Sequence, residues 1–190
     1  MKAQYYTATS IDGFIADENN SLDWLFEVGE GQDTGGRYTE FFRQVGAMAM
    51  GSTTYLWIIE HGQLLEHPNK WQDEFGYGDT PCWVFTHRDL PVIAGADVRF
   101  ARGDVEPVHR QMAAAAAGKN IWVVGGGDLV GQFVDRGLLD EIILGVAPVA
   151  LGAGAPVLPR RLTGSALTLT GAEPEGGFAY LTYEVARADR

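Results

Sequence analysis

The fold of this chain is decided by Ile121-Trp122-Val123-Val124-Gly125-Gly126-Gly127-Asp128-Leu129. An apolar, β-branched run ends in three glycines, and an amphipathic pattern follows at once. This order predicts a buried strand, a tight turn and the start of a helix. Glycines at such a turn let a ligand approach the main chain, and the first amides of a helix suit a phosphate or diphosphate. A turn packed tightly for structural reasons alone is the alternative, and the stretch by itself favours neither.

The composition is that of a globular domain. The chain has 190 residues, of which 46% are hydrophobic and 21% charged, which is enough for one domain with its own core. Its formal net charge of -11 argues against non-specific binding to nucleic acid or to an anionic membrane. We therefore expect a single domain over residues 1–190 that binds neither.

The compartment is inferred from what the sequence lacks. The N-terminus has no apolar signal-peptide region, and no apolar run approaches membrane-spanning length. The single Cys82 rules out an intrachain disulfide, and the four histidines have no metal-ligand spacing. We expect a cytoplasmic protein without a metal site.

Strands and helices alternate along most of the chain. We expect strands over 3–8, 47–50, 82–86, 97–101, 121–124 and 140–149. We expect helices over 38–45 with Thr34 as a cap, from Gly51 onward, over 104–117, and from the glycine turn to about 136, with 66–80 irregular. Segments 166–170 and 180–185 alternate around a turn at 174–177, which predicts a hairpin. This order is typical of an α/β fold whose sheet is mostly parallel with an antiparallel edge.

The candidate binding residues follow the predicted strands. In an open α/β sheet, ligands bind at the carboxyl ends of the strands. Two strand ends, at Gly51 and at Gly125, place a glycine at a helix start, and Ser52, Thr53 and Thr54 add hydroxyls that either cap the helix or bind phosphate oxygens. Two such helix starts on one edge would suit a dinucleotide, although the glycine turn matches neither G-x-G-x-x-G nor the P-loop.

Four segments, in order, resemble the dihydrofolate-reductase-like family, which includes the reductase domain of riboflavin biosynthesis. They are Thr9-Ser10-Ile11-Asp12-Gly13-Phe14-Ile15-Ala16, Met50-Gly51-Ser52-Thr53-Thr54-Tyr55, Val123-Val124-Gly125-Gly126-Gly127, and Asp140-Glu141-Ile142 with the stretch from Pro148 to Pro159. The resemblance implies a three-layer fold with a mostly parallel central sheet of about eight strands and an antiparallel C-terminal hairpin. It also implies a homodimer that binds NADPH and transfers a hydride to a small pteridine- or pyrimidine-like heterocycle.

The same resemblance implies which residues bind the cofactor. Ala8 and Ile11 would contact the nicotinamide end. The phosphates and the adenosine end would be held by three further sets: Gly51, Ser52, Thr53 and Thr54; Thr86, His87 and Arg88; and the diphosphate turn of Gly125, Gly126, Gly127, Asp128 and Leu129.

Two residues are candidates for the substrate side. Asp12 matches the loop aspartate of the family, which predicts a polar contact with substrate or a catalytic proton relay, and a turn-forming role before Gly13 is the equal alternative. Trp24 follows a polar loop and is a candidate for the substrate pocket, with a place in the core as its alternative.

Three departures from the family pattern leave the substrate open. Ser52 stands where the family often has Arg or Lys, and Arg88 or Arg102 could replace that charge. The segment 34–38 has no carboxylate at the place where dihydrofolate reductases have their proton donor. Apart from Arg37 and Arg43, no basic set is found for the ribose phosphate that the riboflavin-pathway reductase must bind. A non-catalytic nucleotide-binding or ligand-sensing domain is the alternative function.

Overall fold

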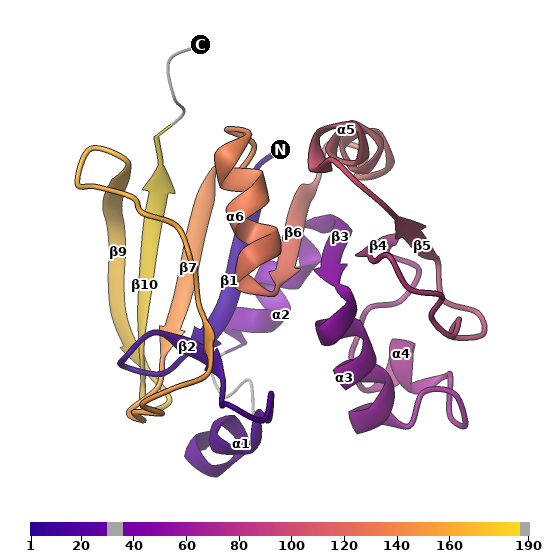
Figure 1. Ribbon diagram of the computed structural model, residues 1–190, viewed down its shortest axis with the longest axis horizontal. Helices are drawn as coiled ribbons and strands as arrows, with labels where there is room; N and C mark the ends of the chain where they lie inside the picture. The colour runs from indigo at the N-terminus through magenta and orange to yellow at the C-terminus, as the bar shows by residue number, and fades with distance from the viewer. Residues whose placement is uncertain (30–35, 187–190) are drawn as a thin grey trace.

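The computed structural model describes residues 1–29 and 36–186, which form a twisted sheet with helices on both faces (Figure 1). The strands are β1 (Ala3–Thr9), β2 (Phe14–Ala16), β3 (Val45–Gly51), β4 (Cys82–Phe85), β5 (Val98–Ala101), β6 (Asn120–Gly125), β7 (Glu141–Val146), β8 (Ala155–Pro156), β9 (Leu167–Glu175) and β10 (Phe178–Val185). The helices are α1 (Asp23–Gly29), α2 (Arg37–Arg43), α3 (Ser52–Gly62), α4 (Lys70–Asp73), α5 (Val105–Ala115) and α6 (Gly127–Asp135).

The main sheet has eight strands in the order β5-β4-β3-β6-β1-β7-β10-β9. The first six are parallel, whereas β10 runs antiparallel to β7 and β9 antiparallel to β10. The stretch that decides the fold forms β6, which lies between β3 and β1, and then turns into α6. The predicted α/β fold, with a mostly parallel sheet and an antiparallel C-terminal hairpin, is confirmed.

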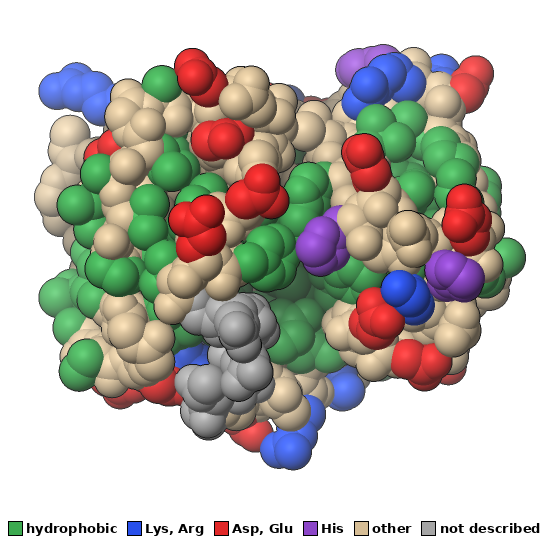
Figure 2. Space-filling view, turned by 90° about the horizontal axis from the view of Figure 1, so that it is seen from below, with side chains coloured by type: hydrophobic (Ala, Val, Ile, Leu, Met, Phe, Trp, Pro, Cys, Tyr) green, Lys and Arg blue, Asp and Glu red, His purple; other side chains and the backbone are tan. Residues whose placement is uncertain are grey.

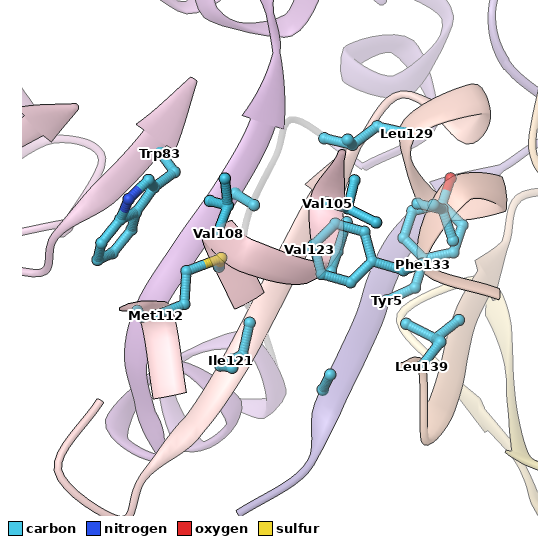
Figure 3. Packing of buried hydrophobic residues seen from close by; sticks show 14 of the residues in the cluster. Tyr5, Trp83, Val105, Val108, Met112, Ile121, Val123, Leu129, Phe133 and Leu139 are labelled. Carbon is cyan, nitrogen blue, oxygen red and sulfur yellow. The ribbon is translucent and has the colours of Figure 1, made fainter. Parts of the chain in front are cut away.

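Alternation along the central strands divides the interior into two cores. On β3, Ala47 and Ala49 face α5 and α6, whereas Met48 and Met50 face α3 and α4. A period of two is what a strand with both faces buried requires. Small residues on β3 leave room for the side chains from α5 and α6, which Figure 3 shows packed against the sheet. The fold therefore has three layers, with the sheet between two layers of helices and one core on each face of the sheet.

Several elements differ from the sequence predictions, and among them the strand predicted over 140–149 ends at Val146. Val45 begins β3 instead of ending the preceding helix, which stops at Arg43. The helix α2 begins after Gly36, a left-handed residue, and Thr34 lies outside the described residues. Two short helices, α1 and α4, form where none was expected; α4 lies in the segment predicted to be irregular. Helices this short depend on tertiary packing, as the buried Trp71 of α4 illustrates, and local pattern does not reveal them.

The C-terminal hairpin has a tighter turn than expected. The turn consists of Gly176 and Gly177 alone, both with positive φ, as a type I′ turn requires. Pro174 therefore belongs to β9, opposite Ala179. Because β9 is an edge strand, the missing N–H of Pro174 can face away from the sheet.

A loop crosses the start of α6 and completes the carboxyl edge of the sheet. Its strand β8 pairs with β2, and the amide of Val157 donates a 2.8 Å hydrogen bond to the carbonyl of Gly13. The hydroxyl of Tyr5, from the middle of the sheet, donates a 3.0 Å bond to the carbonyl of Val157. A Cβ on Gly127 would lie 2.6 Å from that same carbonyl oxygen and closer still to that of Pro156. The loop can therefore cross α6 only because residue 127 is glycine.

Within the described residues, no helix combines the length and the apolar character needed to cross a membrane.

Gly127→Ala should destabilise the protein. The added methyl overlaps two backbone carbonyls that cannot move aside as a flexible side chain can, so we expect a loss of about 2 kcal/mol in the free energy of unfolding. Gly164→Ala is the matched control, because its Cβ would meet nothing within 4 Å, and it should change stability by less than about 0.5 kcal/mol. Urea unfolding measures both; equal stabilities for the two variants would contradict the close approach.

Candidate functional site

A cleft of about 810 Å³ opens at the carboxyl edge of the sheet. Figure 2 looks onto this edge and shows a hollow with hydrophobic side chains in its depth. Ten of the predicted cofactor residues line the cleft: Ala8, Gly51, Ser52, Thr53, Thr54, Gly125, Gly126, Gly127, Asp128 and Leu129. The structure thus brings together the two glycine-led helix starts and the end of β1.

The starts of α3 and α6 meet inside this cleft. A Cβ on Gly51 would lie 3.7 Å from the amide nitrogen of Gly126, so the two turns are in contact. Both helices have glycine as the N-cap residue, without a side chain to accept hydrogen bonds from their first amides. By contrast, α5 has a side-chain cap, because Asp104 accepts a 3.0 Å hydrogen bond from the amide of Glu106. The hydroxyls of Ser52 to Thr54 therefore do not cap α3.

Each glycine of the triplet meets a different requirement. Gly125 has φ of +142°, a conformation that only glycine adopts readily, and its peptide bond to Gly126 is cis. Gly127 permits the backbone crossing described above. Gly126 has an ordinary φ of -75°, and the nearest atom to a Cβ there would be a methyl of Ile15 at 3.8 Å. Tight packing thus accounts for Gly127, whereas a Cβ on Gly126, which lines the cleft, would make only ordinary contact with Ile15.

Arg88 reaches the rim of the cleft. Its guanidinium Nη2 donates a 2.9 Å hydrogen bond to Oγ of Ser52, a cleft residue. Thr86 is buried, and its Oγ1 accepts a 2.9 Å bond from the amide of Arg88, which fixes the turn that carries the arginine. Thr86, exposed His87 and Arg88 do not themselves line the cleft. Arg102, the other candidate cation, is paired with Asp89 instead.

Asp12 joins two loops outside the cleft lining. Its carboxylate accepts hydrogen bonds from Oγ of Ser10 at 2.6 Å, from the amide of Gly152 at 2.7 Å and from the amide of Leu151 at 3.1 Å. These bonds, that from Ser10 first, lower the pKa of Asp12 from 3.8 to about 2. The carboxylate is therefore ionised at neutral pH and holds the loop after β1 against the loop after β7. Its predicted contact with substrate or proton stays a prediction.

Ile11 and Trp24 also lie outside the lining. Ile11 is 66% exposed at the outer side of its loop, and Trp24 is buried with 6% of its surface accessible. Leu22 and Leu25, on either side of Trp24, line the cleft in its place. The assigned roles of Ile11 and Trp24 stay predictions.

Aromatic residues form one wall of the cleft, and they were not identified as site residues from the sequence. One part of the cleft is lined by aromatic residues from four elements, β1, α2, β6 and β10: Tyr6, Tyr38, Trp122, Phe178 and Tyr180. The ring of Tyr38 lies 5.9 Å from that of Trp122, and Tyr6 lies 6.4 Å from both Tyr38 and Tyr180, measured between centroids. We refer to these five side chains as the aromatic wall. A possible signal was the alternation of Tyr6 with Ala8, which places both on one face of β1.

An ion-pair cluster lies behind Tyr180. Arg37 pairs through Nη2 with Glu173 at 2.5 Å and through Nε with Glu175 at 2.9 Å. Its guanidinium carbon also lies 4.5 Å from the centroid of the Tyr180 ring. The cluster ties α2, which carries Tyr38, to the C-terminal hairpin, which carries Phe178 and Tyr180. It therefore links the two sides of the aromatic wall.

Comparison with known proteins connects this chain to a family. A family model described as the RibD C-terminal domain matches residues 63–176. The uncharacterized protein YwjB of Bacillus subtilis (strain 168) is 32% identical over 188 residues, with 96% of this chain and 97% of that protein covered.

Solved structures share the fold. A protein from Shewanella sp. PV-4, named for riboflavin biosynthesis, has a TM-score of 0.74 at 24% identity, with 98% of this chain and all of the other covered. The Thermotoga maritima diaminohydroxyphosphoribosylaminopyrimidine deaminase/5-amino-6-(5-phosphoribosylamino)uracil reductase has a TM-score of 0.68 at 14% identity, covering 97% of this chain and 56% of that one. Enterococcus faecalis dihydrofolate reductase, in complex with NADP(H), gives 0.54 at 12% identity, with 97% and 96% covered. The expected dihydrofolate-reductase-like fold is confirmed.

The pKa of Asp12 can be tested by NMR titration of its carboxyl carbon. We expect a midpoint of about 2, and a higher midpoint in Ser10→Ala, which removes the strongest of the hydrogen bonds. Because the folded pKa is depressed, the contribution of Asp12 to stability should be complete above about pH 4 and disappear as the pH falls toward 2. A midpoint near 3.8 in the wild type would contradict the loop-joining role.

Proposed function

The chain belongs to the RibD C-terminal domain family, and from that premise we propose that it is an NADPH-dependent reductase. The proposed reaction is transfer of a hydride to a small pteridine- or pyrimidine-like heterocycle. When bound, NADPH would supply the hydride, and the protein would supply binding, orientation and electrostatics.

The observation that carries this proposal is the meeting of two helix starts at the cleft. The first amides of α3 and α6 carry partial positive charge, and glycine at each N-cap leaves them without a side-chain acceptor. Gly126 lines the cleft without a side chain, which fits a diphosphate against the start of α6. Ser52 and Arg88, hydrogen-bonded at the rim, are suited to the 2′-phosphate, because a guanidinium binds phosphate oxygens in pairs.

The other residues that line the cleft support the proposed binding of a planar hydride acceptor. Ala8 and Gly145, on neighbouring strands β1 and β7, also line the cleft, and the Tyr180 ring of the aromatic wall lies close to Gly145. Apolar rings around a planar acceptor would exclude water and orient the acceptor by stacking. A homodimer remains part of the proposal; the edge strand β9, where Leu169 is 53% exposed, provides a surface for it.

Gly126→Val should abolish tight cofactor binding while the fold survives. A valine side chain would fill the space reserved for the diphosphate, so we expect the Kd for NADPH, measured by calorimetry, to rise at least tenfold. Its φ is compatible with valine, and the melting temperature should stay within a few degrees of the wild type. Gly164→Val, in open space, is the control. Wild-type affinity in Gly126→Val, or no binding of NADPH by the wild type, would overturn the proposed cofactor site.

Consumption of NADPH then separates catalysis from binding alone. Oxidation followed at 340 nm with pterins, pyrimidines and flavin precursors would support the reductase. Binding of NADPH without oxidation by any compound that itself binds would favour the alternative of a ligand-sensing domain.

Arg88→Ala should reduce the preference for NADPH over NADH. If Arg88 binds the 2′-phosphate, its removal should weaken NADPH binding about tenfold or more and leave NADH binding within about twofold, since only NADPH carries that group. Arg102→Ala removes a neighbouring cation that is already paired with Asp89, and it should change neither affinity. Equal losses for both cofactors in Arg88→Ala would mean that the arginine acts on the fold and not on the phosphate.

A further inference from the structure

We infer that the acceptor bound at the aromatic wall is an uncharged planar ring compound without a phosphate group. The inference rests on the proposed reductase function, and it deepens that function by naming the class of substrate. It follows from three observations on the described residues: the shape of the aromatic wall, the charges that line the cleft, and the pairing of Arg37 with two glutamates.

The aromatic wall is built for a flat, apolar ligand. Tyr38 and Trp122 meet edge to face at 5.9 Å, and Tyr180 continues the wall toward Phe178 at 6.1 Å. Rings of this kind offer π-faces on which a heterocycle can stack, together with hydroxyls at their edges. Such a surface contributes contact area to a planar ligand and does not compensate a dianion.

The charges on the cleft lining also favour a ligand without a phosphate group. Among the described lining residues, the one formal charge is that of Asp128, at the start of α6. It is negative, and Arg160 pairs with it at 3.2 Å. The sequence of the undescribed segment 30–35 contains no Lys or Arg. A phosphate on the acceptor would therefore lie among aromatic rings without a cation from this lining.

The cation behind the wall is held by two carboxylates. Arg37 stacks on Tyr180 and does not itself line the cleft, and its Nε and Nη2 both donate hydrogen bonds to glutamates. The group of Arg37, Glu173 and Glu175 has a net charge of -1, so it repels an anion. A phosphorylated substrate would have to displace a glutamate from Arg37 or bind beside it uncompensated. The two glutamates are thus specificity-determining residues, because they neutralise a cation that would otherwise attract phosphate.

The test uses pairs of compounds that differ by a single phosphate. Riboflavin with FMN and neopterin with neopterin monophosphate are titrated into the protein, with and without saturating NADP⁺, and binding is followed by calorimetry. We expect the unphosphorylated member of at least one pair to bind ten times more tightly than its phosphate ester. Tighter or equal binding of the phosphate ester, or binding of no member at millimolar concentration, would overturn the inference.

Two sets of variants locate the effect. Tyr38→Leu should weaken binding of the unphosphorylated compound at least fivefold, whereas Phe100→Leu, a partly exposed ring on β5 outside the cleft, should not. Glu173→Gln with Glu175→Gln should reduce the preference for the unphosphorylated compound at least fivefold, because Arg37 loses its carboxylates. Glu74→Gln with Glu106→Gln removes the same charge from the surface pairs with Lys70 and Arg110 and should leave the preference unchanged. The same preference in both double variants would contradict the role of the glutamates.

The outcome also separates this inference from the function on which it rests. Failure of NADPH to bind, while the unphosphorylated ring compounds still bind at Tyr38, would overturn the reductase and leave the ligand class standing. Binding and oxidation of NADPH with a phosphorylated acceptor would support the reductase and overturn the ligand class.

Discussion

The close approach of two backbones at Gly127 is the constraint on which the site depends. The first turn of α6 lies against the carbonyls of Pro156 and Val157 with no room for a Cβ. That contact brings the loop after β7 across the end of the sheet, where β8 pairs with β2 and the Tyr5 hydroxyl holds the carbonyl of Val157. The loop then closes one side of the cleft. Gly126, which precedes Gly127 in the turn, lines the same cleft. Packing thus depends on Gly127, and the proposed binding depends on the adjacent Gly126 of the same turn.

In the proposed function, a protein of net charge -11 would hold an anion without a cluster of lysines. The positive potential would come from the starts of two helices, whose amides are fixed by the backbone. Arg88 adds one cation at the rim, where only the far end of a dinucleotide would reach it. At the opposite end, Arg37 is neutralised by Glu173 and Glu175. The arrangement therefore separates a region suited to phosphates from a region suited to rings within one continuous cleft.

Much of the candidate site was accessible to sequence reasoning, because its backbone elements are local. A strand followed by glycine and a helix can be recognised within ten residues, and both such turns were predicted to meet at one edge. The roles predicted for Asp12 and Trp24 stay predictions. Asp12 accepts hydrogen bonds from Ser10, Leu151 and Gly152 and lies outside the lining, and Trp24, in the short helix α1, is buried. In a loop or a short helix the direction of a side chain depends on distant partners, so periodicity does not determine it.

The sequence by itself determined the order of the longer strands and helices, the antiparallel C-terminal hairpin, and the glycine-led starts of α3 and α6. Each of these rests on short-range physics: side-chain alternation, helix start signals and backbone freedom at glycine. Only the tertiary structure decided which residues form the aromatic wall and that Arg37 pairs with two glutamates of the hairpin. It also decided the different surroundings of Gly125, Gly126 and Gly127. The physical reason is that these contacts join residues on different elements, from Gly127 against Val157 to Arg37 against Glu173, which lie 136 positions apart. The register between strands and the path of the crossing loop bring these residues together.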